Sequence, residues 1–203
     1  MMLRGRCEPR FEWLEWISGV PARQIINTGT AVNTSSSAIE CEWMLVNSGS
    51  HVNYAPIFGN YISESSPCFR LFLDSTDSAY RVNGNYNGSA SYGISGIAAG
   101  VKHKITLTGR NITVDSTTYS TSISRSYTND KPVLICAVRD FSDDTRFVAY
   151  SLKVYSFLIR NGSTVLRDFV PCRLGGDVGM YDKISKRFFG NVGTGSFTAG
   201  PKI

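Results

Sequence analysis

The sequence predicts an all-β protein built as an antiparallel, two-sheet sandwich, and three observations lead to this fold class. Apolar and polar residues alternate with a period of two along several segments, as in half-buried strands. Turn signals rich in asparagine and glycine separate these segments at short intervals. Helical spacing is confined to one short stretch, formed by Trp13, Trp16, Ile17 and Val20 and ended by Pro21. Together these features favour sheets packed face to face.

The individual strands follow from the same patterns. In residues 38–46 one face is apolar and the other carries Glu40 and Glu42, and in 101–108 His103 shares the apolar face. Further β-branched and aromatic runs predict strands over 68–74, 132–139 and 146–160. In the last run the apolar side chains change parity, which predicts a β-bulge near residues 154–155.

Length and charge restrict the number of domains and the kinds of partner that we expect for this chain. The 203 residues fit one domain, predicted over residues 12–203 after a basic tail or junction at residues 1–11. The net charge of +5 comes from 21 Lys and Arg against 16 Asp and Glu and gathers at the chain ends, not among aromatics, so nucleic acid is not an expected partner. No apolar run approaches the roughly 20 residues of a membrane helix, and no secretory signal is visible.

The last third of the chain resembles the closing segment of a concanavalin A-like, laminin-G-like jelly-roll module. The matching elements are the strands at 153–157 and 166–173, the GMYD turn at 179–182 and the final GTGSFTAG at 193–200. The early LEWISGVPARQIINTG at 14–29 is similar to the opening strands of the same modules. The resemblance implies a jelly-roll sandwich of the kind found in phage structural or tail proteins and in gut bacterial surface proteins.

Some jelly-roll proteins are β-glucanases, so we ask whether the acidic residues of this chain could form a glycosidase active site. A retaining glycosidase needs two carboxylates about 5–5.5 Å apart. Glu40 and Glu42 share a strand face, but the neighbouring positions of that face hold Ala38 and Met44, so a third acid is missing. We therefore interpret the pair as a solvated outer face and predict a protein without catalysis.

Calcium is the cofactor that the sequence best supports. Asp140, Asp143 and Asp144 lie between two strong strands, and Asp74 and Asp77 lie in a second acidic stretch. Calcium prefers six to eight oxygen ligands, which such loops supply. The flanking arginines leave simple charge neutralisation as the alternative. The five cysteines have no CxxC spacing, so zinc is not predicted.

Residues 80–98 are the candidate ligand-binding stretch, because tyrosines recur there among asparagine and glycine. Aromatic faces stack on the C–H surfaces of sugars, and amides satisfy their hydroxyls. The same composition suits an adaptable protein-binding surface or a plain hairpin loop. The candidate residues are Tyr80, Asn85, Tyr86, Asn87 and Tyr92.

The sequence thus predicts a carbohydrate-binding or adhesion module on a phage particle or a bacterial cell surface. Its expected partner is a glycan or surface polysaccharide, and the basic tail at 1–11 would dock the module onto other virion proteins. A structural capsid or tail protein without sugar binding, forming a homo-oligomer, is the alternative, and a glycan hydrolase is the third hypothesis.

Overall fold

The fold is taken from a computed structural model of the whole chain. The residues it describes are 10–20, 23–32, 36–46, 55–60, 69–76, 79–86, 90–108, 111–120, 130–137 and 151–203. For most of 69–76, 79–86 and 90–96 the description covers the backbone alone.

The larger of two antiparallel sheets runs in the order β11–β10–β9–β4–β13–β14–β15–β16, with β1 on β14, β2 on β13 and β17 on β2. Its strands are β1 (Phe11–Trp13), β2 (Ile17–Gly19), β4 (Ser37–Leu45), β9 (Lys102–Leu107), β10 (Asn111–Val114), β11 (Thr117–Ser120), β13 (Leu152–Asn161), β14 (Thr164–Leu174), β15 (Asp177–Asp182), β16 (Arg187–Phe189) and β17 (Thr198–Ala199).

The smaller sheet runs in the order β3–β12–β5–β6–β7–β8. Its strands are β3 (Ile26–Asn27), β5 (Ala55–Gly59), β6 (Phe69–Thr76), β7 (Ala79–Tyr86), β8 (Ala90–Ile97) and β12 (Leu134–Ile135). The chain passes repeatedly between the sheets, because β4, β9 and β13 of the larger sheet follow β3, β8 and β12 of the smaller one.

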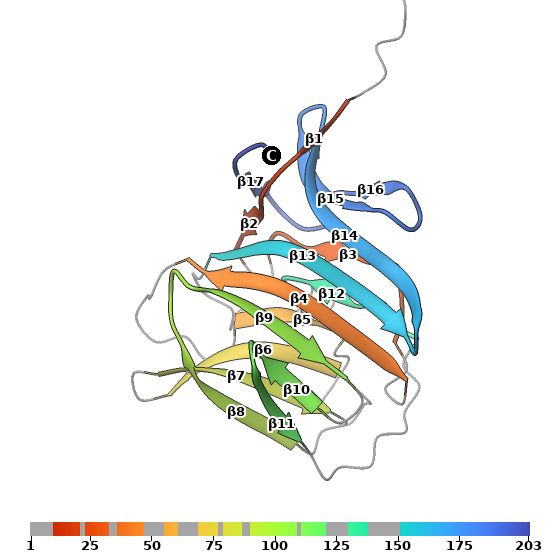
Figure 1. Cartoon of the computed structure of the whole chain (residues 1–203). Coiled ribbons are helices and arrows are strands. Elements are labelled where there is room, and N and C mark those ends of the chain that lie inside the picture. The colour runs from red at the N-terminus through yellow and green to blue at the C-terminus, as the bar shows by residue number, and fades with distance from the viewer. Residues whose placement is uncertain are drawn as a thin grey trace, which may run out of the picture.

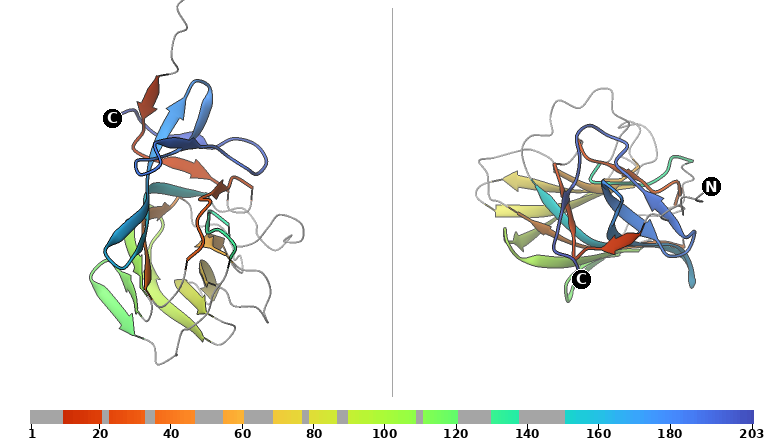
Figure 2. Two further views of the ribbon diagram at one scale, coloured as in Figure 1. Left: turned by 90° about the vertical axis from the view of Figure 1, so that its right-hand side faces the viewer. Right: turned by 90° about the horizontal axis from the view of Figure 1, so that it is seen from above.

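The two sheets lie face to face around an apolar core (Figures 1 and 2). Phe58 of β5 contacts Phe157 of β13 edge to face, with ring centroids 5.4 Å apart, so one aromatic pair joins the two sheets. Trp43 and Phe169 are also fully buried. The prediction of an all-β, two-sheet antiparallel sandwich is confirmed, while membership in the concanavalin A-like group stays a prediction.

Alternation along the chain sets the faces of the central strands as predicted. Cys41, Trp43 and Leu45 of β4 point into the core, as do His103 and Ile105 of β9. The free thiol of Cys41 is fully buried, and burial raises its pKa. Both strands therefore turn their charged residues to the outer face of the larger sheet.

The start of the described chain forms strands, as expected for the 14–29 stretch, which contains β2 and β3. The helical spacing near Trp13 produces no helix, because a segment this short gains more from pairing with β14 and β13 than from an isolated helix. Two local expectations differ from the structure. Within the described part of 132–139, the strand covers only β12, since Cys136 adopts a left-handed backbone with φ of 62°. The Asn83-Gly84 pair, one of the predicted turn signals, lies inside β7 rather than in a turn. Among the described residues no helix is long and apolar enough to cross a membrane.

Both ends of the described chain meet at one end of the larger sheet. Leu14 forms a bridge with Lys202, and the Ile203 amide donates to the Trp13 carbonyl at 3.1 Å. In Figure 1 β1, β2 and β17 lie together at the top, next to β14 and β15. This end of the sheet carries the candidate site.

Candidate functional site

The described parts of the tyrosine-rich stretch form strands. Tyr80, Asn85 and Tyr86 belong to β7 and Tyr92 belongs to β8, where Asn85 pairs with Ser91 and Gly84 with Tyr92. The structure describes the backbone of these residues and not their side chains, and Asn87 lies outside the described residues. Tyr80, Asn85, Tyr86 and Tyr92 thus lie on two antiparallel strands, and their role in binding stays a prediction.

The predicted calcium ligands fall outside what the structure describes. This applies to Asp140, Asp143, Asp144 and Asp77, whereas Asp74 is described only through its backbone in β6. Within the described ranges, no group of three or more His, Cys, Asp and Glu side chains could hold a metal ion. Calcium binding stays a prediction.

The two glutamates of β4 lie on the outer face of the larger sheet in ion pairs. Glu40 contacts Lys104 Nζ at 3.1 Å and Arg160 Nε at 3.5 Å, and Glu42 contacts Lys102 Nζ at 2.6 Å. Each carboxylate thus has a cation from a neighbouring strand, which agrees with the predicted solvated face.

The outer face contains a groove of about 490 Å³, a size typical of ligand sites. It forms where β13 changes partners: Val154 pairs with Ile17 of β2, whereas Phe157 pairs with Phe169 of β14. The link between β1 and β2 contributes Leu14 and Glu15 to the lining. The lining residues are Trp13, Leu14, Glu15, Glu42, Lys102, Tyr155, Val170, Pro171, Tyr181, Lys183 and Ile203.

A β-bulge places Tyr155 in the groove. Against β4, Val154 pairs with Trp43 and Ser156 with Glu42, so Tyr155 is the extra residue of β13. The bulge confirms the one predicted near 154–155. An extra residue breaks the alternation locally and re-aims one side chain. Here it leaves Tyr155 and Ser156 both partly exposed beside the buried Val154 and Phe157.

Trp13 and Tyr181 form one wall of the groove, and Phe11 packs on both rings from outside the lining, so that three aromatic rings from opposite ends of the chain form one cluster. Trp13 stacks on Phe11 with centroids 5.8 Å apart, and Tyr181 meets both rings edge to face at 5.4 and 4.8 Å. Trp13 is 40% exposed and Phe11 36% exposed. Phe11 backs one face of the indole ring, and Trp13 itself lines the groove.

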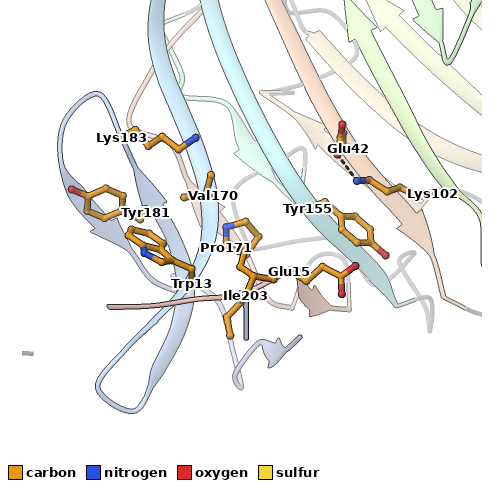
Figure 3. Close-up of a pocket in the computed structure, with 11 residues that line it drawn as sticks. Trp13, Glu15, Glu42, Lys102, Tyr155, Val170, Pro171, Tyr181, Lys183 and Ile203 are labelled. Carbon is orange, nitrogen blue, oxygen red and sulfur yellow. Dashed lines mark ion pairs between the residues drawn. The ribbon is translucent and has the colours of Figure 1, made fainter. Parts of the chain in front are cut away.

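The opposite wall is polar. Figure 3 shows Glu42, Lys102 and Tyr155 there, facing Trp13 and Tyr181 across the groove. Lys102 Nζ lies over the Tyr155 ring, 4.6 Å from its centroid, and the Tyr155 hydroxyl donates to Met44 Sδ at 3.7 Å. Partial burial raises the pKa of the Tyr155 phenol and the nearby Glu15 carboxylate raises it further, although Lys102 opposes both.

A buried carboxylate holds the turn that presents two groove residues. Asp182 is fully buried, and it accepts hydrogen bonds from the amides of Asp168 at 2.8 Å and Ser185 at 3.0 Å. Burial alone would raise its pKa, but the hydrogen bonds outweigh burial and lower it. With Asp182 pointing inward, the adjacent Tyr181 and Lys183 turn outward to the groove.

His103, one of the two histidines, is a buried structural residue. Its Nδ1 lies 2.9 Å from Asp115 Oδ2, in the turn between β10 and β11. Burial opposes ionisation of Asp115, but the contacts with His103 and the Lys104 amide lower the pKa of this carboxyl. This agrees with the interpretation of His103 as a hydrogen-bonded core or rim residue.

Sequence reasoning missed Trp13, Tyr155 and Tyr181 as groove residues. Trp13 belongs to the stretch with helical spacing, and Tyr181 belongs to the GMYD element at 179–182, so neither pattern indicates a binding surface. Phe11 and Trp13 stand two residues apart, which puts both on one face of a strand. That spacing, together with the parity change at Tyr155, was the signal available in the sequence.

Comparisons with known proteins identify no family. No family model matches the chain, and no curated protein matches it. Among solved structures it is similar to one titled "The crystal structure of a functionally unknown protein from Saccharomyces cerevisiae", with a TM-score of 0.40 and 12% identity over 64% of this chain and 72% of that chain. A likeness at this level carries no argument about function.

Proposed function

We propose that the protein is a carbohydrate-binding module whose binding site is the groove on the outer face of the larger sheet. The supporting observation is the aromatic wall formed by Trp13 and Tyr181, with Phe11 packed on both rings, opposite a polar wall. Sugars have apolar C–H faces that stack on aromatic rings and hydroxyl rims that need hydrogen-bonding partners. The groove supplies both within one cavity of about 490 Å³.

Trp13 is the principal stacking surface in this proposal. Tyr155 is less available because Lys102 lies 4.6 Å from its ring centroid. Trp13 has one face against Phe11, lines the groove and keeps 40% of its surface exposed. Stacking on an aromatic ring that another ring supports costs little side-chain entropy, which favours binding.

The polar wall would bind the hydroxyl rim. Glu42 and Lys102, 2.6 Å apart, offer an acceptor and a donor side by side, which suits neighbouring hydroxyls of a sugar ring. Apolar floor residues such as Leu14 and Pro171 exclude water beneath the ring. The proposal includes no catalytic step and keeps display on a virion or a cell surface as the proposed setting.

The first test measures glycan binding of wild type and Trp13→Ala on an array, followed by calorimetry with the best glycan. Loss of the stacking ring should weaken binding by about tenfold or more, equivalent to about 1.4 kcal/mol. Val192→Ala is the matched control, because Val192 is 54% exposed and does not line the groove. Equal glycan affinity of the two variants would show that the groove is not the binding site. Turnover of the bound glycan would contradict a module without catalysis.

A subunit interface is the second candidate function for the same surface. The aromatic cluster and the neighbouring Ile203, which is 77% exposed, form an apolar surface of the kind that assembly proteins bury. If the surface is a subunit interface, the protein should form a defined oligomer, and Trp13→Ala should dissociate it. Light scattering coupled to size exclusion distinguishes the two, since a sugar-binding groove must stay open in solution.

A further inference from the structure

We infer that the groove selects uncharged saccharides and rejects those that carry carboxylates, an inference that rests on the proposed function. The chain as a whole is basic, with a net charge of +5, which on its own favours acidic polysaccharides. The charges that line the groove instead favour uncharged sugars. Four charged residues line it: Glu15, Glu42, Lys102 and Lys183.

Each lysine of the groove is matched by a carboxylate of the protein. Lys102 Nζ lies 2.6 Å from Glu42 Oε2 and also over the Tyr155 ring, and Lys183 Nζ lies 3.3 Å from Asp168 Oδ2. These two pairs therefore add no net positive charge to the groove. A sugar carboxylate that approached either ammonium would also approach the protein carboxylate beside it, and both lysines are about half exposed to water, so the net attraction is small.

The cations next to the aromatic wall are also paired. Arg173 Nη1 and Lys202 Nζ both contact Glu12, at 3.0 and 3.6 Å. Glu12 alternates with Phe11 and Trp13 along β1, so these pairs belong to the other face of that strand. Two cations share one carboxylate here, and the net positive charge that remains lies outside the lining of the groove.

Glu15 contributes an uncompensated negative charge. It makes no ion pair with any residue that the structure describes, and it lies beside Tyr155, whose phenol it affects (Figure 3). Its carboxylate can accept hydrogen bonds from sugar hydroxyls, whereas it repels a carboxylate held beside it. Selection against acidic sugars thus comes from one unpaired acid together with two lysines that are already paired.

The test uses an array that prints each neutral glycan beside its C6-oxidised form, in which primary hydroxyls have become carboxylates. Wild type should bind the neutral member at least about tenfold more tightly than the oxidised member. Raising the salt concentration should change the affinity for the neutral member by less than about twofold, because a neutral ligand makes no screened ion pair.

Glu15→Gln is the diagnostic variant, since it removes the unpaired charge and keeps the size of the side chain. It should reduce the ratio of the affinity for the neutral glycan to the affinity for the oxidised glycan by about threefold or more. Asp130→Asn removes an exposed carboxylate that does not line the groove and should leave the ratio unchanged. Thermal unfolding of both variants shows whether each is folded.

The failures of the inference and of the proposed function differ. Tighter binding of the oxidised forms, or of glycans with free amino groups, would overturn the selection for uncharged sugars and leave carbohydrate binding intact. An unchanged ratio in folded Glu15→Gln would overturn the role of Glu15. Binding of no glycan in either form would overturn the proposed function and this inference together.

Discussion

The outer face of the larger sheet has two halves with opposite chemistry. On β4 and β9, solvent-facing positions hold ion pairs such as Glu40–Lys104. Around β1 and β15 the equivalent positions hold Phe11, Trp13 and Tyr181 in ring contact. Both halves arise from strands that alternate buried and exposed side chains. The difference teaches that alternation identifies the outer face, whereas aromatic residues at outward positions identify the part of it that can bind.

The two halves are also supported differently. The charged half rests on long ladders, in which β4 pairs with β13 on one side and β9 on the other. The aromatic half depends on short strands and a tight turn, with β1 and β16 of three residues each. Asp182 fixes that turn through backbone amides. The aromatic half should therefore be the easier one to disrupt by a single substitution.

The largest effect is expected from Asp182→Ala, which leaves the amides of Asp168 and Ser185 without their acceptor. Loss of a buried, hydrogen-bonded carboxylate should lower the free energy of unfolding by about 3 kcal/mol. Glycan affinity should fall as well, because Tyr181 and Lys183 lose their anchor. Urea unfolding and calorimetry measure the two effects.

The pH dependence of the same carboxyl supplies a control. Its folded-state pKa is lowered, so its stabilisation is present above the unfolded-state pKa of about 4 and is lost as the pH falls through the folded-state pKa. Asp182→Asn should therefore show a smaller loss of stability between neutral and acidic pH than wild type. An equal loss in both proteins would contradict this role of Asp182.

A smaller effect is expected from Phe11→Ala. Phe11 supports the far side of the Trp13 ring, at a centroid distance of 5.8 Å, and does not itself line the groove. Aromatic pairs of this kind contribute about 0.5–1.5 kcal/mol, and only part of that contribution supports the bound ligand, so glycan affinity should fall by about threefold to fivefold. Affinity as low as that of Trp13→Ala would mean that Phe11 contacts the ligand directly.

The smallest effect is expected in the charged half. Glu40→Gln breaks ion pairs with Lys104 and Arg160, both of which are exposed by a third or more. Such surface pairs contribute about 0–1 kcal/mol, so stability should change by less than about 0.5 kcal/mol and glycan affinity not at all. A clear loss of binding would extend the site along β4 beyond Glu42 and remove the distinction between the two halves.

The sequence predicted more of the fold than of the site. The faces of β4 and β9 follow from alternation within each strand, and the bulge in β13 follows from a change of parity. Each of these signals is local. The groove depends on which strands meet: Trp13 and Tyr181 come together because β1 and β15 both pair with β14. No local pattern encodes that pairing.

The predicted ligand residues show the limit of composition as a guide. Tyr80, Tyr86 and Tyr92 were selected because tyrosine, asparagine and glycine cluster there, and the structure forms paired strands from that stretch. Asparagine and glycine favour turns when isolated, but cross-strand pairing across β6, β7 and β8 overrides this tendency. To identify Tyr155 and Trp13 as groove residues, one must know which strands pair with each other.

The bulge at Tyr155 makes the groove depend on chain length as well as on residue identity. A substitution changes one side chain, whereas gain or loss of one residue in a strand exchanges the faces of every position up to the next turn. Phe157 and Ile159 face the core only because one residue before them is left out of the register with β4. Deletion of one residue between Val154 and Phe157 would therefore change the core and the groove together. Related chains should be compared strand face by strand face, since an alignment by identity alone would hide the gain or loss of the groove.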